Sequence, residues 1–266
     1  MPDLSRRRFL GALGTAGVVG ALYGASSNEL EVTTHTHPMA PDAPPLRLAL
    51  LTDMHSPHDY VEGKRLIAAV RRFKPDIIAI AGDAVDRRGE EHHVEFYGAL
   101  DAPLGKFATL GNWEYQGLCD INALKRHYDR VGVRLLVNDA LRLDVGGAPL
   151  DLVGLDDWRA GLPDYGVLQR LPPGPAKTIV LSHCPVTFDA VQQVATRPSL
   201  MLSGHTHGGQ IAPFGLAVLV PEGSGRYVKG WYYSANGHAM YVSRGLGNSG
   251  IPLRIGSRPE LVLITL

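Results

Sequence analysis

From residue 46 onward, the sequence alternates short apolar runs with segments whose apolar residues recur at helical spacing. Residues 46–52, 77–81 and 106–110 form the first three predicted strands. Helical spacing marks residues 61–73 and 118–131. The second half of the chain adds six predicted strands, at 141–145, 149–153, 177–181, 200–202, 240–242 and 261–265. Strands that alternate with helices are typical of an α/β fold, and we expect residues 46–266 to form one domain.

The first 26 residues differ from the rest of the chain. Ser5-Arg6-Arg7-Arg8-Phe9-Leu10 resembles the bacterial twin-arginine export motif, and residues 9–25 carry no charge. That stretch holds five glycines and is shorter than the roughly 20 residues that cross a bilayer comfortably. We therefore expect residues 1–26 to be a cleaved signal, with a retained membrane anchor as the alternative. Through the twin-arginine translocase the protein would reach the periplasm or the outer face of the cell envelope.

Residues 27–45 are polar and rich in proline, which is typical of a linker. Within them, His35-Thr36-His37 has a spacing that could bind a metal ion. Because no strand is predicted before this motif and no partner motif lies nearby, we expect a solvated linker between the membrane and the domain.

Composition narrows the class of protein. The chain has 26 Lys and Arg against 26 Asp and Glu, and 45% of its residues are hydrophobic, which describes an ordinary globular protein. The absence of net positive charge argues against a dedicated nucleic-acid binder. Two cysteines, Cys119 and Cys184, exclude a disulfide-dense module and a four-cysteine zinc domain.

Polar residues with ligand chemistry directly follow five of the predicted strands. The five motifs are Asp53-Met54-His55, Gly82-Asp83, Gly111-Asn112-Trp113-Glu114, Ser182-His183 and Gly204-His205-Thr206-His207. Any one of them could be a turn or a helix cap. Because the carboxyl ends of strands line the ligand crevice of an open α/β sheet, five such motifs predict a single site.

In this order, the motifs resemble the calcineurin-like metallophosphoesterase superfamily, whose pattern is Asp-x-His, Gly-Asp, Gly-Asn-His-Asp/Glu, His and Gly-His-x-His. The resemblance covers nearly all of the chain after residue 46. It implies a four-layer αββα sandwich, with two central mixed sheets flanked by helices and a two-metal site along one edge. Residues 241–247 and 258–261 further resemble twin-arginine-exported phosphodiesterases related to UDP-2,3-diacylglucosamine pyrophosphatases.

The resemblance also implies the ligands of two divalent metal ions. One ion would be held by Asp53, His55, Asp83 and His207, and the other by Asp83, Asn112, His183 and His205. Asp83 would bridge the two ions. Nitrogen and oxygen ligands without thiolate suit Mn, Fe or Zn. In such a site a metal-bridging hydroxide attacks phosphorus in line, so Asp83, Asn112 and His205 would serve catalysis by holding the ions.

At position 113 the sequence departs from the superfamily, because Trp113 stands where a His is thought to protonate the leaving group. An indole N–H does not release a proton near neutral pH, so this position cannot supply general-acid catalysis. A phosphate leaving group, with a pKa of about 6, needs no such proton, whereas an alkoxide does. The substitution favours pyrophosphates or activated diesters as substrates, rather than alkyl phosphomonoesters.

Other residues could complete the site. His58, in the loop after the first motif, could donate the missing proton, as could a metal-bound water. Arg244, at a predicted strand end, could bind phosphate through two hydrogen bonds. Trp113 could form a wall of the substrate pocket or pack in the core, and Glu114 could cap the following helix or hold a ligand in place.

Two further predictions concern residues outside the five motifs. The glycine-rich and aromatic residues 223–233 could form a mobile loop over the site or an ordinary surface hairpin. The histidines outside any motif are expected at the surface, namely His92, His93, His127 and His238.

Together, these patterns predict an exported two-metal phosphohydrolase that cleaves phosphodiester or pyrophosphate bonds in the cell envelope. Its substrate would be a phosphodiester or a nucleotide-linked lipid, encountered in solution or at a membrane surface. One alternative is a UDP-2,3-diacylglucosamine pyrophosphatase of lipid A synthesis, whose substrate is expected inside the cell. The other is a non-catalytic, metal-binding envelope protein.

Overall fold

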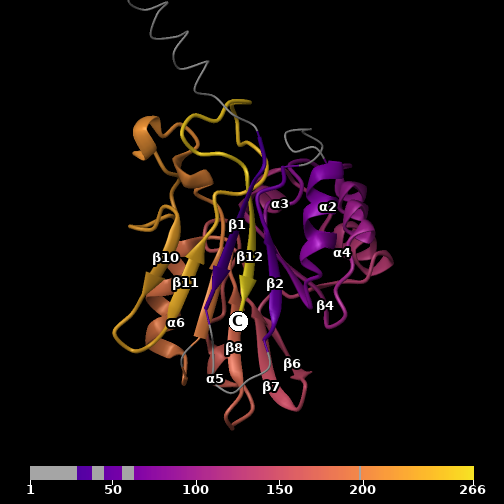
Figure 1. Ribbon diagram of the computed structural model, residues 1–266, viewed down its shortest axis with the longest axis vertical. Coiled ribbons are helices and arrows are strands. Elements are labelled where there is room, and N and C mark those ends of the chain that lie inside the picture. Colours follow the sequence, from indigo (N-terminus) through magenta and orange to yellow (C-terminus); the bar gives the residue numbers. More distant parts are fainter. Residues whose placement is uncertain (1–28, 38–44, 56–62, 198) are drawn as a thin grey trace, which may run out of the picture.

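Two six-stranded sheets form the centre of the molecule (Figure 1). The computed structural model describes residues 29–37, 45–55, 63–197 and 199–266. In order across the first sheet, the strands are β1 (Glu31–Thr36), β12 (Glu260–Thr265), β2 (Arg47–Leu51), β3 (Ile77–Ala81), β4 (Gly105–Thr109) and β5 (Val133–Leu135). In order across the second, they are β10 (Gly230–Tyr233), β11 (Ala239–Val242), β9 (Ser199–Ser203), β8 (Lys177–Leu181), β7 (Ala148–Gly154) and β6 (Asp139–Val145).

Both sheets are mixed, with a parallel centre. Strands β2 to β5 run parallel, and β12 joins them antiparallel to β2. In the second sheet β7, β8, β9 and β11 run parallel, while β6 and β10 are antiparallel edge strands. The carboxyl ends of the parallel strands of each sheet therefore lie together at one edge.

Alternating side chains of each strand divide between two apolar layers. On β2, Leu48 and Leu50 pack between the sheets, whereas Ala49 and Leu51 face the helices. Outside the first sheet lie α2 (Gly63–Phe73), α4 (Ile121–Arg130) and a 3-10 helix (Glu91–Ala99). Outside the second lie α5 (Gly166–Gln169) and α6 (Phe188–Val194). The expected four-layer sandwich is confirmed.

All nine predicted strands are present, within three residues of the expected bounds. The two predicted helices appear as α2 and α4, and the short α3 (Asn112–Gln116) lies between them. Asp120 caps α4 by accepting a hydrogen bond from the backbone N–H of Ala123 at 3.0 Å. The apolar spacing of α4 buries Leu124 and Tyr128, four residues apart on one face.

The prediction of a linker over residues 27–45 is wrong for its central part, because Glu31–Thr36 forms β1, parallel to β12. The pattern was missed because one face of this edge strand stays exposed and its partner lies more than 200 residues away. His35 Nε2 lies 3.0 Å from the hydroxyl of Tyr241, and His37 stacks on Trp231 with 4.8 Å between ring centroids. These two histidines therefore help to join the two sheets.

Strands β10 and β11 bear on two other predictions, the form of residues 223–233 and the position of His238. Residues 230–233 form the edge strand β10, which favours the hairpin interpretation of the glycine-rich segment. His238 is only 3% exposed, so its expected surface position is wrong. His92 is exposed, and His93 and His127 are partly buried.

The predicted export signal, residues 1–26, lies outside the described residues, as does His58. Among the residues that the structure does describe, no helix combines the length and the apolar character needed to cross a bilayer.

Candidate functional site

The seven predicted ligand residues gather at the shared carboxyl edge of the two sheets. They follow β2 (Asp53 and His55), β3 (Asp83), β4 (Asn112), β8 (His183) and β9 (His205 and His207). All seven side chains are buried, none more than 5% exposed. The backbone N–H of His205 donates to Oδ1 of Asp53 at 2.9 Å, so the ends of β2 and β9 are joined directly across the two sheets.

The backbone at this edge is strained. Among the described residues other than glycine, ten have a positive φ, and half of them belong to the site: Asp53, His55, Asp83, His205 and His207. Such conformations are costly and tend to be kept where function requires them. Gly82 is needed for another reason, since a Cβ there would lie 2.7 Å from the Cα of Gly111. The ends of β3 and β4 can approach this closely only because both positions are glycine.

The first cluster of ligand atoms comes from Asp53, His55 and His207, which each place one ligand atom within 4.8 Å of the others. Nε2 of His55 lies 3.0 Å from Nε2 of His207. Nε2 of His207 lies 3.4 Å from Oδ1 of Asp53.

The second cluster comes from Asp83, His183 and His205, again within 4.8 Å of one another. Oδ2 of Asp83 lies 3.0 Å from Nε2 of His183 and 3.9 Å from Nε2 of His55 in the first cluster. Asp83 therefore stands between the two clusters, as the sequence predicts for a bridging ligand.

Hydrogen-bond partners define which nitrogen of each ring carries the proton. Nδ1 of His183 donates to the carbonyl oxygen of Ala81 at 2.8 Å, and Nε2 of His205 donates to that of Glu222 at 2.7 Å. In neutral rings, Nε2 of His183 and Nδ1 of His205 would both be unprotonated. Burial alone would lower the pKa of His183, but the charge of Asp83 and its hydrogen bond raise that pKa well above its usual value, so without a metal ion Nε2 of His183 carries a proton. Nε2 of His183 lies 3.1 Å from Nδ1 of His205 and 3.0 Å from Oδ2 of Asp83, so this one proton faces two buried acceptors. A metal ion bound here would displace that proton and be held by the two nitrogens and the carboxylate.

Two residues that the sequence analysis missed hold the histidines of the first cluster. Oδ1 of Asp86 lies 2.5 Å from Nδ1 of His55, which directs the unprotonated Nε2 toward His207. Nη2 of Arg254 donates to Nδ1 of His207 at 3.0 Å, so the neutral ring carries its proton on Nε2. Binding of a metal ion by Nε2 of His207 would displace that proton. Asp86 follows the Gly-Asp motif by three residues, whereas no motif marks Arg254.

Asn112 shows an unused ligand atom. Its Oδ1 is buried and has no hydrogen-bond partner among the described residues. Unpaired buried carbonyl oxygens are costly. Bound cations readily accept oxygen ligands of this kind, so Asn112 fits a metal site better than a purely structural position.

The electrostatics favour cation binding. Burial alone would raise the pKa of Asp83, but the charge of His183 and its hydrogen bond lower that pKa to about 2. Asp83 is therefore ionised at neutral pH. Burial lowers the pKa of His205 to about 4, with a further contribution from His183. His205 is accordingly a neutral ring with a free lone pair, which is the form that binds metal ions.

Glu114 accepts hydrogen bonds from four backbone N–H groups. Its carboxylate accepts from Gly111 at 2.8 Å, at the start of α3, and from Asp83, Ala84 and Val85 at 3.1, 2.6 and 3.3 Å. Burial, followed by the charge of Asp83, raises the pKa of Glu114 to about 7. Both expected roles are present in the structure, since Glu114 caps the helix and holds the segment that carries Asp83.

A cavity of about 540 Å³ opens beside the clusters, and its lining includes Asp83, Asn112, Trp113, Arg159, His205 and His207. Trp113 is partly exposed and forms part of this wall, which favours the pocket interpretation over core packing. Its backbone N–H donates to Oδ1 of Asp83 at 2.8 Å, so the indole is fixed close to the clusters.

The structure does not place Arg244 as expected. Its Nη1 lies 3.0 Å from Oε2 of Glu31, and its Nε donates to Oε2 of Glu260 at 3.2 Å. Arg244 is absent from the lining of the cavity. Because two carboxylates already occupy the guanidinium, a phosphate contact by Arg244 is not supported. Arg159 is the guanidinium that the cavity lining does contain.

Comparison with known proteins agrees with this geometry. Residues 46–209 match the family model of the calcineurin-like phosphoesterases. The chain is 32% identical over 291 residues to the "uncharacterized metallophosphoesterase YkuE" of Bacillus subtilis (strain 168), covering 100% of this chain and 99% of that one. It is 30% identical to the "transmembrane protein with metallophosphoesterase domain" of Bos taurus, covering 96% of this chain and 60% of that one.

Among solved structures, the fold is similar to that of GAP50, "the anchor in the inner membrane complex of Plasmodium". The TM-score is 0.52 at 13% identity, and the match covers 82% of this chain and 80% of that one. At this identity the likeness concerns the fold alone.

Proposed function

The chain belongs to the calcineurin-like phosphoesterase family, and we propose that it is a two-metal phosphohydrolase that cleaves phosphodiester or pyrophosphate bonds in the cell envelope. Family membership makes it a phosphoric ester hydrolase. The number of metal ions, the bond that is cleaved and the compartment are the parts of this function that we infer.

The observation that carries the proposal is the convergence of two ring nitrogens and a carboxylate oxygen in a buried site. Nε2 of His183 lies 3.1 Å from Nδ1 of His205 and 3.0 Å from Oδ2 of ionised Asp83. These three atoms match the ligand set of a divalent ion, which would displace the proton of His183 on binding. The second cluster would hold one ion together with Oδ1 of Asn112. The first cluster, from Asp53, His55 and His207, would hold the other. This nitrogen and oxygen donor set suits Mn, Fe or Zn.

When bound, the two ions would polarise a phosphoryl oxygen and make a water molecule nucleophilic near neutral pH. The residues of the chain prepare the site for this chemistry. Asp83 contributes the charge between the clusters, and Glu114 holds its backbone in place. Asp86 and the carbonyl oxygen of Ala81 orient the rings of His55 and His183. Such fixed geometry reduces the reorganisation needed in the transition state.

Trp113 supports a restricted substrate class. It lines the cavity at the position where the family pattern has a His, and its N–H cannot serve as a general acid. Bonds whose leaving group departs without a proton, such as pyrophosphates and aryl diesters, suit this site best. Alkyl monoesters would lack the required proton donor.

The envelope location rests on the sequence. Arg6, Arg7 and Arg8 followed by an uncharged stretch support export through the twin-arginine translocase. Because that route carries proteins already folded, the metal ions would be loaded before export.

The test is hydrolysis of bis-p-nitrophenyl phosphate and of a UDP-linked diacyl lipid by the full chain with added Mn²⁺. We expect metal-dependent cleavage that is lost in Asp83→Asn. The matched control is Asp189→Asn, which removes a carboxylate that accepts a hydrogen bond from Tyr227 on the far side of the second sheet.

The ratio of the two rates ranks the substrates. Preference for the diester supports a general phosphodiesterase, and preference for the UDP lipid supports a nucleotide-lipid pyrophosphatase. A metal-replete protein that cleaves neither compound would contradict the proposed function and favour the non-catalytic alternative.

A further inference from the structure

Four large apolar side chains lie exposed on one short segment at the rim of the cavity. We call Phe214, Leu216, Val218 and Leu219 the apolar lip; they are 101, 74, 70 and 81% exposed. The described residues contain ten exposed large hydrophobic side chains, so four of them fall within six consecutive positions. Single exposed apolar residues are ordinary, but a contiguous group at a cavity mouth marks an interaction site. No charged residue occurs between positions 210 and 221.

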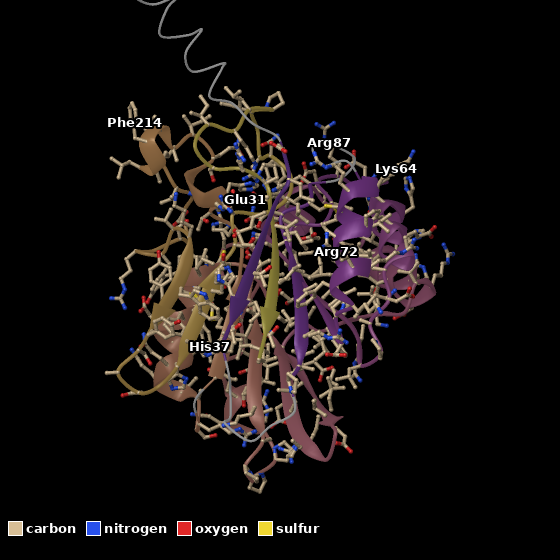
Figure 2. All side chains as sticks on the ribbon, viewed as in Figure 1. Glu31, His37, Lys64, Arg72, Arg87 and Phe214 are labelled. Atoms are coloured by element: carbon tan, nitrogen blue, oxygen red, sulfur yellow. The ribbon has the colours of Figure 1, made fainter. Side chains whose placement is uncertain are left out.

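The backbone of the segment is built to present these side chains. Phe214 has a φ of 58°, a left-handed conformation that a bulky residue rarely adopts. The backbone N–H of Ala212 donates to the carbonyl oxygen of Ile255 at 2.7 Å, and Nζ of Lys229 donates to that of Gly215 at 3.2 Å. The turn is thus tied to two other segments while the Phe214 side chain projects away from the body (Figure 2). A strained backbone that holds the Phe214 ring in contact with water points to a functional role.

The apolar lip is continuous with the metal-ligand clusters. Val218 and Leu219 line the same cavity as Asp83 and His205, and Ile211 and Val220 extend the apolar wall between them. A phosphate held at the clusters would therefore have apolar surface beside it, leading out to Phe214. A small polar diester would cover little of this apolar wall, whereas the acyl chains of a lipid would cover it.

The chain also enters the fold at this edge. Glu29 pairs with Arg258 at 4.0 Å, and the neighbouring Ser257 donates from its Oγ to the carbonyl oxygen of His207 at 2.6 Å. Figure 2 shows Glu31 toward the same end of the molecule as Phe214, and His37 toward the opposite end. The uncharged residues 9–25 precede this entry point by only a few positions. If residues 1–26 are retained as the alternative membrane anchor, they join the domain at the edge that carries the apolar lip.

We propose that the apolar lip inserts into the surface of a lipid bilayer, and that the site acts on phosphodiester or pyrophosphate lipids in that surface. The part of this proposal that concerns lipid substrates rests on the proposed function. Insertion would bring the cavity mouth against the lipid headgroups, so that a lipid phosphate reaches the clusters while its acyl chains stay against Ile211, Val218 and Leu219. Transfer of Phe and Leu side chains from water into an apolar phase is strongly favourable and supplies the driving force.

Insertion is tested by fluorescence, without reference to catalysis. Leu216→Cys in the full chain is labelled with a polarity-sensitive fluorophore, and Cys119 and Cys184 are buried and give little background. Ala235→Cys is the matched control, because it is exposed in the turn between β10 and β11, at the far end of the second sheet. With vesicles of phosphatidylglycerol and phosphatidylcholine, we expect a blue shift at position 216 and none at position 235.

Three results would overturn insertion. The first is no shift at position 216 with vesicles. The second is an equal shift at both positions, which would indicate adsorption without orientation. The third is a shift at position 216 that grows with protein concentration in the absence of vesicles, which would make a second copy of the chain the occupant.

The substrate class is tested by rates. In the double variant Phe214→Ser and Leu216→Ser, the rate on a diacyl phosphodiester in vesicles divided by the rate on bis-p-nitrophenyl phosphate should fall at least tenfold. Tyr233→Ser, which removes a 67% exposed ring at the far end of β10, should leave that ratio unchanged. An unchanged ratio in the double variant would overturn the lipid substrate. Failure of the wild type on both substrates, with the position 216 shift intact, would instead contradict the proposed function.

Discussion

Nδ1 of His55 lies 2.5 Å from Oδ1 of Asp86, a carboxylate that belongs to none of the recognisable ligand motifs. The contact orients the ring and places the proton on Nδ1, so that the unprotonated Nε2 faces the first cluster. Backbone carbonyl oxygens orient the rings of His183 and His205 instead, through Nδ1 and Nε2 respectively. Of these three histidines, only His55 relies on a side chain that can be replaced by mutation.

Replacement of Asp86 should therefore weaken metal binding specifically. In Asp86→Asn, we expect the affinity for Mn²⁺ to fall about 10- to 100-fold, because the ring loses its orienting acceptor and some basicity. Isothermal titration of metal-free protein measures the change. Asp189→Asn serves as the control, and equal affinities in wild type and Asp86→Asn would show that the contact has no part in metal binding.

Replacement of Trp113 by His should restore the missing proton donor. The backbone N–H of residue 113 is fixed to Asp83 and the side chain lines the cavity, so an imidazole there would face the substrate. We expect Trp113→His to raise turnover of alkyl-leaving-group esters more than that of aryl ones, since general-acid catalysis is worth about 10²–10⁴-fold only where the leaving group needs a proton. Equal effects on both ester types would refute the missing-acid explanation.

His238 should make stability depend on pH far from the metal-ligand clusters. Its Nδ1 accepts from the backbone N–H of Ser199 at 3.2 Å, and burial lowers its pKa below the usual 6.5. Between the two pKa values the unfolded chain binds a proton that the folded chain does not. The stabilisation is thus present above pH 6.5 and is lost as the pH falls through the folded pKa.

The measurement is chemical unfolding of wild type and His238→Asn at pH 7.5 and pH 5. The amide of Asn can accept the same hydrogen bond without titrating. Relative to the variant, the wild type should lose about 1 kcal/mol of unfolding free energy at the lower pH, the value of a typical hydrogen bond. A difference that is the same at both pH values would contradict this assignment.

The sequence was informative where local pattern decides the outcome. Apolar runs predicted the strands, and the polar motifs directly after them predicted which side chains meet, because strand direction fixes where a carboxyl end lies. The polar strand β1 was missed, since its stability comes from pairing with β12 at the other end of the chain. Arg244 was assigned to phosphate for the same reason, because its partner Glu31 lies 213 residues away.

Other features depend on packing that no local pattern records. Arg254 is fully buried and reaches His207 from a loop that carries no motif. The sequence Pro213-Phe214-Gly215 predicts an ordinary turn, and only the exposure and backbone conformation of Phe214 distinguish it. Such residues emerge only when segments distant in sequence are placed together.

The most direct test of the central claim is a count of metal ions per chain against activity. Metal-free full-length protein is loaded stepwise with Mn²⁺, bound metal is counted by elemental analysis, and cleavage of bis-p-nitrophenyl phosphate is followed at each step. Two clusters with Asp83 between them predict that activity reaches its maximum at two bound ions per chain and is absent in Asp83→Asn. Full activity with one ion or none, or no activity with two, would contradict a two-metal hydrolase.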